Sequence, residues 1–134
     1  MNGGLPGARL RHVTAFIDDN LGRRLPLAEL SAEARLSPYH FTRLFKQSTG
    51  SPPHRFVVRR RIERACALLI EGQLSVDAVA RAVGFRTRSH FSMVFHRLTG
   101  SPPTVYRAFA SVRDTDGAVH DHVAEYRHDD VESE

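Results

Sequence analysis

The sequence has a single cysteine, Cys66, no tryptophan, and only one lysine, Lys46, among its 19 basic residues. One cysteine excludes an intramolecular disulfide framework and fits a reducing compartment. No run of 18 apolar residues is present, which excludes an ordinary membrane-spanning helix. Residues 1–7 also lack the basic-then-apolar pattern of a secretion signal. We therefore expect a cytoplasmic protein, with room in its 134 residues for one domain of ordinary size.

Charge is distributed unevenly along the chain. Residues 9–110 hold 17 basic and 7 acidic side chains, whereas residues 111–134 hold 2 basic and 8 acidic ones. A basic compact region suits a polyanionic partner better than an acidic substrate. The apolar periodicity ends at Ala110, so we expect residues 111–134 to form a disordered acidic tail. Residues 1–8 carry no charged side chain and are expected to form a flexible N-terminus.

The sequence contains an internal repeat. Residues 40–53 (HFTRLFKQSTGSPP) and 90–103 (HFSMVFHRLTGSPP) are identical at eight of fourteen positions. The similarity continues upstream at an offset of 49, where one apolar set pairs with another: Leu27, Leu30, Ala34 and Leu36 with Val76, Val79, Val83 and Phe85. Two copies of one supersecondary unit explain this pattern, and two are too few for a solenoid.

Each copy has the pattern of two helices joined by a short turn. In the first copy the apolar stripes are Leu27, Leu30, Ala34 and then Phe41, Leu44, Phe45, with the small Ser48 at the next position of the second stripe. Ser37-Pro38 is typical of a helix start, and Gly50 of a helix end. The second copy has the stripes Val76, Val79, Val83 and Phe91, Val94, Phe95, Leu98, with Gly84 breaking the first helix, Thr87 as the predicted cap and Gly100 at the end. This pattern predicts two helix-turn-helix units in an all-α fold.

Three further helices are predicted around these units, the last of them starting at Ser101-Pro102. Leu10, Val13, Ile17 and Leu21 indicate a helix before the first unit, ending at Gly22. Val58, Ile62, Ala65 and Leu69 indicate a long helix from about Pro53 to Ile70, spanning roughly 27 Å. The predicted boundaries are 9–51 for the first helix-turn-helix, 52–71 for the linker helix and 72–110 for the second.

The faces opposite the apolar stripes carry hydrogen-bonding and basic side chains. In the first copy these are Tyr39, Thr42, Arg43 and Lys46, and in the second Ser89, Ser92, Met93 and His96, with Arg86, Arg88 and Arg97 close by. An arginine can contact guanine O6 and N7 with two hydrogen bonds, worth about 1–3 kcal/mol of discrimination. The linker helix adds Arg55, Arg59, Arg60, Arg61 and Arg64, of which Arg61 lies near the apolar side and the others could meet phosphates.

Three motifs together resemble the DNA-binding domain of the AraC/XylS regulators, over about residues 9–109. They are L-S-x-x-x-F-x-R-x-F-K-x-x-x-G-S-P in residues 36–52, R-x-x-x-A-x-x-L-L in residues 61–69, and G-F-x-x-x-S-x-F-x-x-x-F followed by T-G-x-x-P-x-x-Y-R in residues 84–107. The resemblance implies seven helices, with two recognition helices in successive major grooves of double-stranded DNA, about 34 Å apart.

Site residues follow from the resemblance position by position. Base readout is expected from Tyr39, Thr42, Arg43, Arg88, Ser89, Ser92 and Met93. Phosphate contact is expected from His40, Lys46, Arg59, Arg86, His90, His96 and Arg97. The resemblance implies a transcription regulator that is not an enzyme and needs no cofactor or metal. It also implies binding to the nucleoid as a monomer, with RNA polymerase as a partner, as in the single-domain MarA/SoxS-like members.

The sequence departs from the family pattern at four positions. Arg35 stands where a glycine is usual, at a cost of about 1 kcal/mol if the backbone there has positive φ. Met93 and His96 replace an arginine and a lysine, which predicts less stringent reading by the second unit. Pro26 replaces a capping Ser or Asp.

Other classes of function rest on weaker patterns. Cys66 could be a nucleophile, but its place beside the apolar stripe favours a buried inert thiol. His120, His122 and His128, with Asp121, Asp129 and Asp130, could bind a metal, but their spacing is not specific. A protein-interaction module is a third alternative. The chain could also be the DNA-binding fragment of a longer regulator whose sensor domain is absent.

Overall fold

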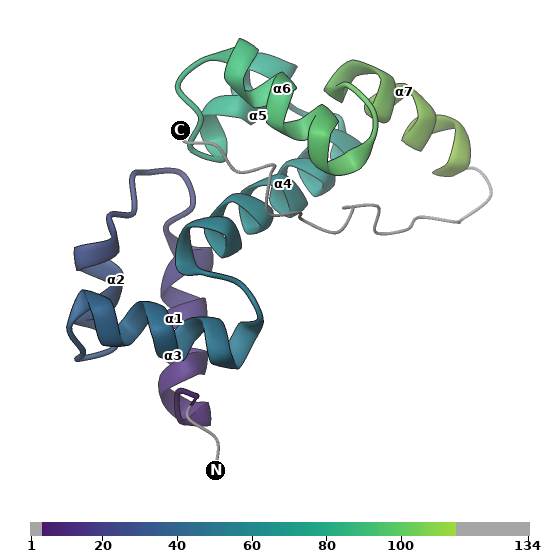
Figure 1. Cartoon of the computed structure of the whole chain (residues 1–134). Helices are drawn as coiled ribbons and strands as arrows, with labels where there is room; N and C mark the ends of the chain where they lie inside the picture. The colour runs from purple at the N-terminus through teal and green to yellow at the C-terminus, as the bar shows by residue number, and fades with distance from the viewer. Residues whose placement is uncertain (1–3, 115–134) are drawn as a thin grey trace. The chain divides into compact units, whose positions relative to one another are not determined.

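The computed structural model describes residues 4–114, with side chains as far as residue 111. Within this range the chain forms seven α-helices and no strand, which confirms the all-α prediction (Figure 1). The helices, in chain order, are α1 Gly7–Asp19, α2 Leu27–Glu33, α3 Pro38–Thr49, α4 Pro53–Glu71, α5 Val76–Ala82, α6 Arg88–Thr99 and α7 Pro103–Asp114.

The chain divides into two compact units, Met1–Val58 and Arg59–Glu134. The first contains α1 to α3 and the start of α4, and the second contains the rest of α4 and α5 to α7. The repeat seen in the sequence corresponds to α2–α3 in one unit and α5–α6 in the other. In both units the shorter helix packs directly on the longer one that follows it. The predicted helix-turn-helix pairs are therefore present.

Phenylalanines anchor the core of the first unit. Phe41 and Phe45, one turn apart on α3, have no exposed surface, and the ring of Phe45 meets Phe56 of α4 edge to face at 5.1 Å. Removing either buried ring would cost about 3–5 kcal/mol. Around them lie apolar side chains from the other helices of the unit and from the segments that flank these helices, namely Leu5, Val13, Ile17, Leu21, Leu30, Ala34 and Val57.

The second unit repeats the aromatic anchor. Phe91 and Phe95 of α6 are fully buried, and Phe95 lies edge to face with Tyr106 of α7 at 5.4 Å. Arg107, next to Tyr106, donates from Nε to the carbonyl oxygen of Leu69 at 3.1 Å and from Nη2 to that of Leu74. These bonds satisfy a carbonyl near the end of α4 and hold the loop that follows it against α7.

Local signals set the helix ends as predicted. The side chains of Ser37 and Thr87 accept hydrogen bonds from the backbone N–H groups of His40 and His90, at 3.2 and 3.1 Å. These caps satisfy one of the unpaired donors at the start of α3 and of α6. At the other ends Gly50 and Gly100 adopt left-handed conformations, with φ of 86° and 90°. The two longer helices of the repeat therefore begin and end in the same way.

The structure corrects several details of the sequence analysis. Residues 1–8 were expected to be flexible, but Leu5 is buried, its N–H donates to Ser48 Oγ at 2.7 Å, and α1 begins at Gly7. The acidic tail was expected from residue 111, but α7 continues to Asp114. The rest of the predicted tail, residues 115–134, lies outside the described residues. Leu27 is 41% exposed, although it belongs to a predicted buried stripe.

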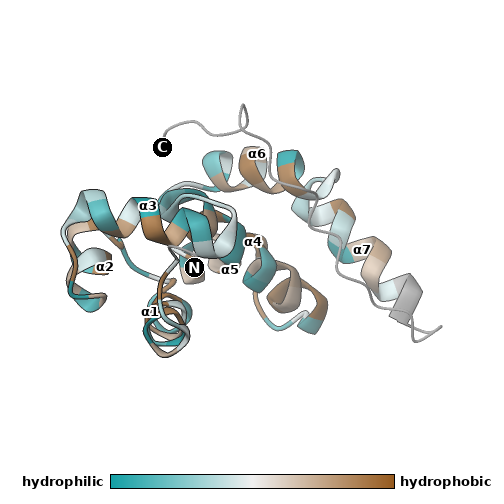
Figure 2. Cartoon of the chain, turned by 60° about the horizontal axis from the view of Figure 1, so that its bottom comes forward, coloured by the Kyte–Doolittle hydropathy of each residue, from teal (hydrophilic) through white to brown (hydrophobic). Residues whose placement is uncertain are grey.

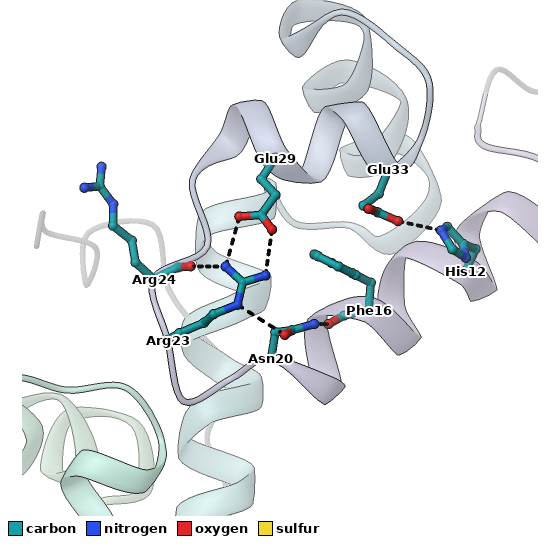
Figure 3. A network of polar contacts seen from close by, with 7 residues as sticks. All are labelled: His12, Phe16, Asn20, Arg23, Arg24, Glu29 and Glu33. Atoms are coloured by element: carbon teal, nitrogen blue, oxygen red, sulfur yellow. Dashed lines mark hydrogen bonds and ion pairs between the residues drawn. The ribbon is translucent and has the colours of Figure 1, made fainter.

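A polar network holds the connection between α1 and α2 (Figure 3). Arg23 donates to both carboxylate oxygens of Glu29, at 3.0 and 2.6 Å, and its guanidinium lies 5.8 Å from the centre of the Phe16 ring. The hydrogen bonds between Arg23 and Glu29 lower the pKa of the Glu29 carboxyl and raise the pKa of the Arg23 guanidinium. Arg23 Nε also donates to Asn20, which in turn donates to the carbonyl of Phe16. This loop is therefore fixed by charge-assisted hydrogen bonds.

Candidate nucleic-acid interface

The outer face of α3 presents the side chains that the sequence placed there. Tyr39 is 72% exposed, Arg43 and Lys46 are exposed, and Thr42 is half-buried. They alternate with the buried Phe41 and Phe45, so one face of the helix lies in the core and the other faces solvent. Figure 2 shows this alternation as hydrophobic and hydrophilic positions along α3. The predicted line of hydrogen-bonding and basic groups is thus brought together on one accessible helix surface.

The charges on this face are available for a ligand. Helix α3 has no acidic residue, and within the described residues neither Arg43 nor Lys46 is paired with an Asp or Glu. An unpaired guanidinium keeps its planar set of donors for an external acceptor. The face therefore combines a cationic hydrogen-bond donor in the middle of the helix with an ammonium near its end.

The predicted phosphate ligands His40 and His90 have different surroundings. His40 is exposed, and its Nδ1 lies 3.0 Å from the capping hydroxyl of Ser37. His90 is half-buried, with its ring 5.3 Å from Phe85 in an edge-to-face arrangement. His40 thus remains exposed despite its cap contact, whereas the His90 ring packs partly against the core of its unit.

The outer face of α6 has its basic residues near the two ends of the helix and a methionine in the middle. Arg88, Ser89 and Met93 are exposed, Met93 by 49%, and Ser92 is half-buried. The exposed side chains of Arg86, His96 and Arg97 lie before and after them in the sequence. Because a thioether cannot grip guanine as a guanidinium does, the middle of this face offers an apolar contact where α3 offers Arg43.

Sequence reasoning missed one contact of this face. Nη1 of Arg88 lies 3.5 Å from Oδ1 of Asp77, a residue in the first turn of α5. An acidic residue at a helix start is explained locally by the helix dipole, so no sequence pattern points to a partner on another helix. Asp77 therefore belongs with the candidate interface.

The basic side chains of α4 are partly engaged within the protein. Arg59 and Arg60 both approach Glu63, at 3.5 and 3.7 Å, and Arg59 is about one-third exposed. Arg61 is half-buried with its Nε atom inaccessible, in agreement with its predicted place near the apolar side. The charge of Arg59, a predicted phosphate ligand, is thus partly offset by the carboxylate of Glu63.

The described residues offer little for other chemistry. Cys66 is buried at 8% exposure, as expected of an inert thiol. No group of three or more metal-ligating side chains occurs within residues 4–111, and the predicted alternative with His120, His122 and His128 lies outside the described part. None of the helices described is both long and apolar enough to cross a membrane.

Comparison with known proteins agrees with this geometry. A family model described as a helix-turn-helix domain matches residues 30–108. Over 94 residues the chain is 39% identical to the probable transcriptional regulator LumQ of Photobacterium leiognathi, covering 70% of this chain and 38% of LumQ. The chain spans between 30% and 39% of the lengths of the first three curated relatives that it matches.

Solved structures show the same fold. The DNA-binding domain of AdpA, a global transcriptional factor crystallised with a target DNA, superposes with a TM-score of 0.76 at 34% identity, covering 81% of this chain and 98% of that one. A regulator from Chromobacterium violaceum described as having an AraC-type DNA-binding domain superposes with a TM-score of 0.73 at 25% identity, covering 78% and 93% of the two chains. From the family match, the repeated helix pairs and these structures together, the chain belongs to the AraC-type helix-turn-helix family.

Proposed function

We propose that this chain is a sequence-specific, double-stranded DNA-binding transcription regulator. The observation that carries the proposal is the pair of matching helices, α3 and α6, each with a buried aromatic face and an accessible polar face. The similarity of this chain to AdpA, whose DNA-binding domain was crystallised with a target DNA, supports DNA binding by these helices. In the proposed mode α3 and α6 enter the major groove at two successive half-sites.

The side chains divide into two roles in this proposal. Base edges are read by Tyr39, Thr42 and Arg43 of α3 and by Arg88, Ser89, Ser92 and Met93 of α6. Phosphates are met by His40, Lys46, Arg59, Arg86, His90, His96 and Arg97, which position the protein without specifying sequence. The exposure of Arg43 and Lys46 supports their roles, and the approach of Arg59 to Glu63 weakens that of Arg59.

The proposal extends to the state in which the chain acts. One copy carries both reading helices, so a monomer suffices for an asymmetric site with two unlike halves. The proposed location is the nucleoid in the cytoplasm, and RNA polymerase is the partner through which promoter activity changes. Because the curated relatives are longer than this chain, the proposal concerns its DNA-binding region, whether the chain acts alone or as part of a longer regulator.

Selection of binding sites from random duplexes tests the proposal. We expect the chain to enrich one asymmetric site with two half-sites about one helical turn apart, at one chain per duplex. Affinity for the selected site should exceed that for a scrambled duplex by a factor of about 10³ or more, with a steep decrease as salt rises. Equal affinity for both duplexes, or no binding at low ionic strength, would reject the proposal.

A further inference from the structure

An ion pair at the start of α6 has no counterpart among the described residues of the first unit. Arg88, the first residue of α6, places Nη1 3.5 Å from Oδ1 of Asp77 on α5. By the internal repeat, the corresponding residues of the first unit are Pro38 and Ala28, which cannot form an ion pair. The pair therefore distinguishes the candidate reading surface of the second unit from that of the first.

The helix dipole acts in opposite ways on the charges of the two partners. Asp77 lies in the first turn of α5, where the partial positive charge of the helix start favours a carboxylate. Arg88 lies in the first turn of α6, where the same partial charge disfavours a guanidinium. The carboxylate of Asp77 offsets this repulsion. An exposed arginine side chain can adopt many conformations, and the carboxylate favours those that bring the guanidinium close to its oxygen.

The contact leaves an edge of the guanidinium available. Arg88 and Asp77 are 50% and 53% exposed, so DNA could reach both of them. A guanidinium has five N–H donors in one plane, and the contact with Asp77 involves Nη1. The edge formed by Nε and Nη2 keeps two parallel donors, which is the arrangement that guanine O6 and N7 require. Within the described residues, no other carboxylate is paired with Arg88.

We propose that Asp77 is a positioning residue for base readout by α6. It holds Arg88 through Nη1 so that the Nε–Nη2 edge meets a guanine of the second half-site. Its negative charge also repels phosphates, which keeps Arg88 on the base and away from the DNA backbone. This proposal rests on the DNA-binding function proposed above. Because exposed ion pairs are weak, Asp77 changes the discrimination by about two- to fivefold.

The test measures base preference as well as affinity. The whole chain is titrated against the selected duplex and against duplexes that carry each of the other bases at every position of the second half-site. We expect Asp77→Asn to reduce the preference for guanine at one position by about two- to fivefold, and affinity for a scrambled duplex to stay equal or increase. Glu71→Gln, which removes the same charge from an exposed residue at the end of α4, should leave every preference unchanged.

A double-mutant cycle separates positioning from a structural role. Arg88→Ala should abolish the preference at the same position, and adding Asp77→Asn to Arg88→Ala should change nothing further. An unchanged preference in Asp77→Asn would overturn the proposal. So would an effect of Asp77→Asn that persists without Arg88, since Asp77 would then act through the stability of α5. Absence of duplex binding by the wild-type chain would instead overturn the proposed function.

Discussion

Arg35 and Gly84 occupy the same position in the two units, and both have a left-handed backbone, with φ of 61° and 91°. Each follows a short helix, and each donates its N–H to a carbonyl three residues back, at 3.0 Å. The next residues, Leu36 and Phe85, donate to carbonyls five residues back, which completes the same helix-ending turn in both units. The turn demands positive φ, and only the second unit meets that demand with a glycine.

This relationship predicts opposite effects of two substitutions. Arg35→Gly should raise the free energy of unfolding by about 1 kcal/mol, because a residue with a Cβ is strained at positive φ. Gly84→Ala should lower it by about 1 kcal/mol or more for the same reason. Urea denaturation followed by circular dichroism measures both. Destabilisation by Arg35→Gly would contradict the expectation.

Arg107 should contribute strongly to the stability of the second unit. Its guanidinium donates to the carbonyls of Leu69 and Leu74, and a hydrogen bond from a charged donor is worth about 1.5–3 kcal/mol. We expect Arg107→Met, which keeps the apolar stem, to lower the free energy of unfolding by about 2 kcal/mol. Val57, the equivalent residue of the first unit, is buried in the core and makes no such bonds. A loss below about 0.5 kcal/mol would mean that the bonds contribute little beyond exposed polar contacts.

Arg43 and Lys46 should affect binding in different ways. Arg43→Ala should cost about 1–3 kcal/mol at one base pair of the first half-site and relax the preference there. Lys46→Ala should weaken binding to all sequences alike and reduce the salt dependence by about one phosphate contact. Titration of single-base variants at several salt concentrations distinguishes the two. A uniform loss for Arg43→Ala would assign this residue to the backbone instead.

Met93 predicts unequal reading of the two half-sites. Since α6 has a methionine where α3 has Arg43, we expect the selected sites to carry less information in the second half than in the first. Met93→Arg should add a guanine preference in that half, worth about 1–3 kcal/mol. Site selection with both proteins measures this directly. Equal information in both halves for the wild-type chain would contradict the prediction.

Glu29 should make stability depend on pH. Its pKa is lowered in the folded chain by the hydrogen bonds from Arg23, so its contribution is present above the ordinary pKa of a glutamate, 4.5, and is lost as pH falls through the lowered value. At neutral pH, Glu29→Gln should therefore be less stable than the wild type. The difference should shrink in acid. Denaturation at about pH 7 and pH 3 tests this, and a difference that is the same at both values would exclude the ion pair as its source.

Much of the candidate interface was predictable because it depends on helical periodicity. Tyr39, Arg43 and Lys46 lie on the accessible face of α3 because the residues between them, Phe41 and Phe45, lie in the core. The pairing of Asp77 with Arg88 was not predictable in the same way. It joins two helices, and each partner also has a plausible role on its own helix. Such a contact depends on how α5 packs on α6, which periodicity does not specify.

The sequence by itself determined the number and kind of helices, their duplication and most of their ends. These features depend on neighbouring residues, such as the Ser37 cap or the left-handed Gly50 and Gly100. Only the tertiary structure decided which apolar residues fill the cores and which distant groups meet. Leu5 joins the first core through a contact 43 residues away, and Arg107 reaches Leu69 across 38. Such contacts form only when helices pack, because side-chain shape and unpaired backbone groups then select their partners.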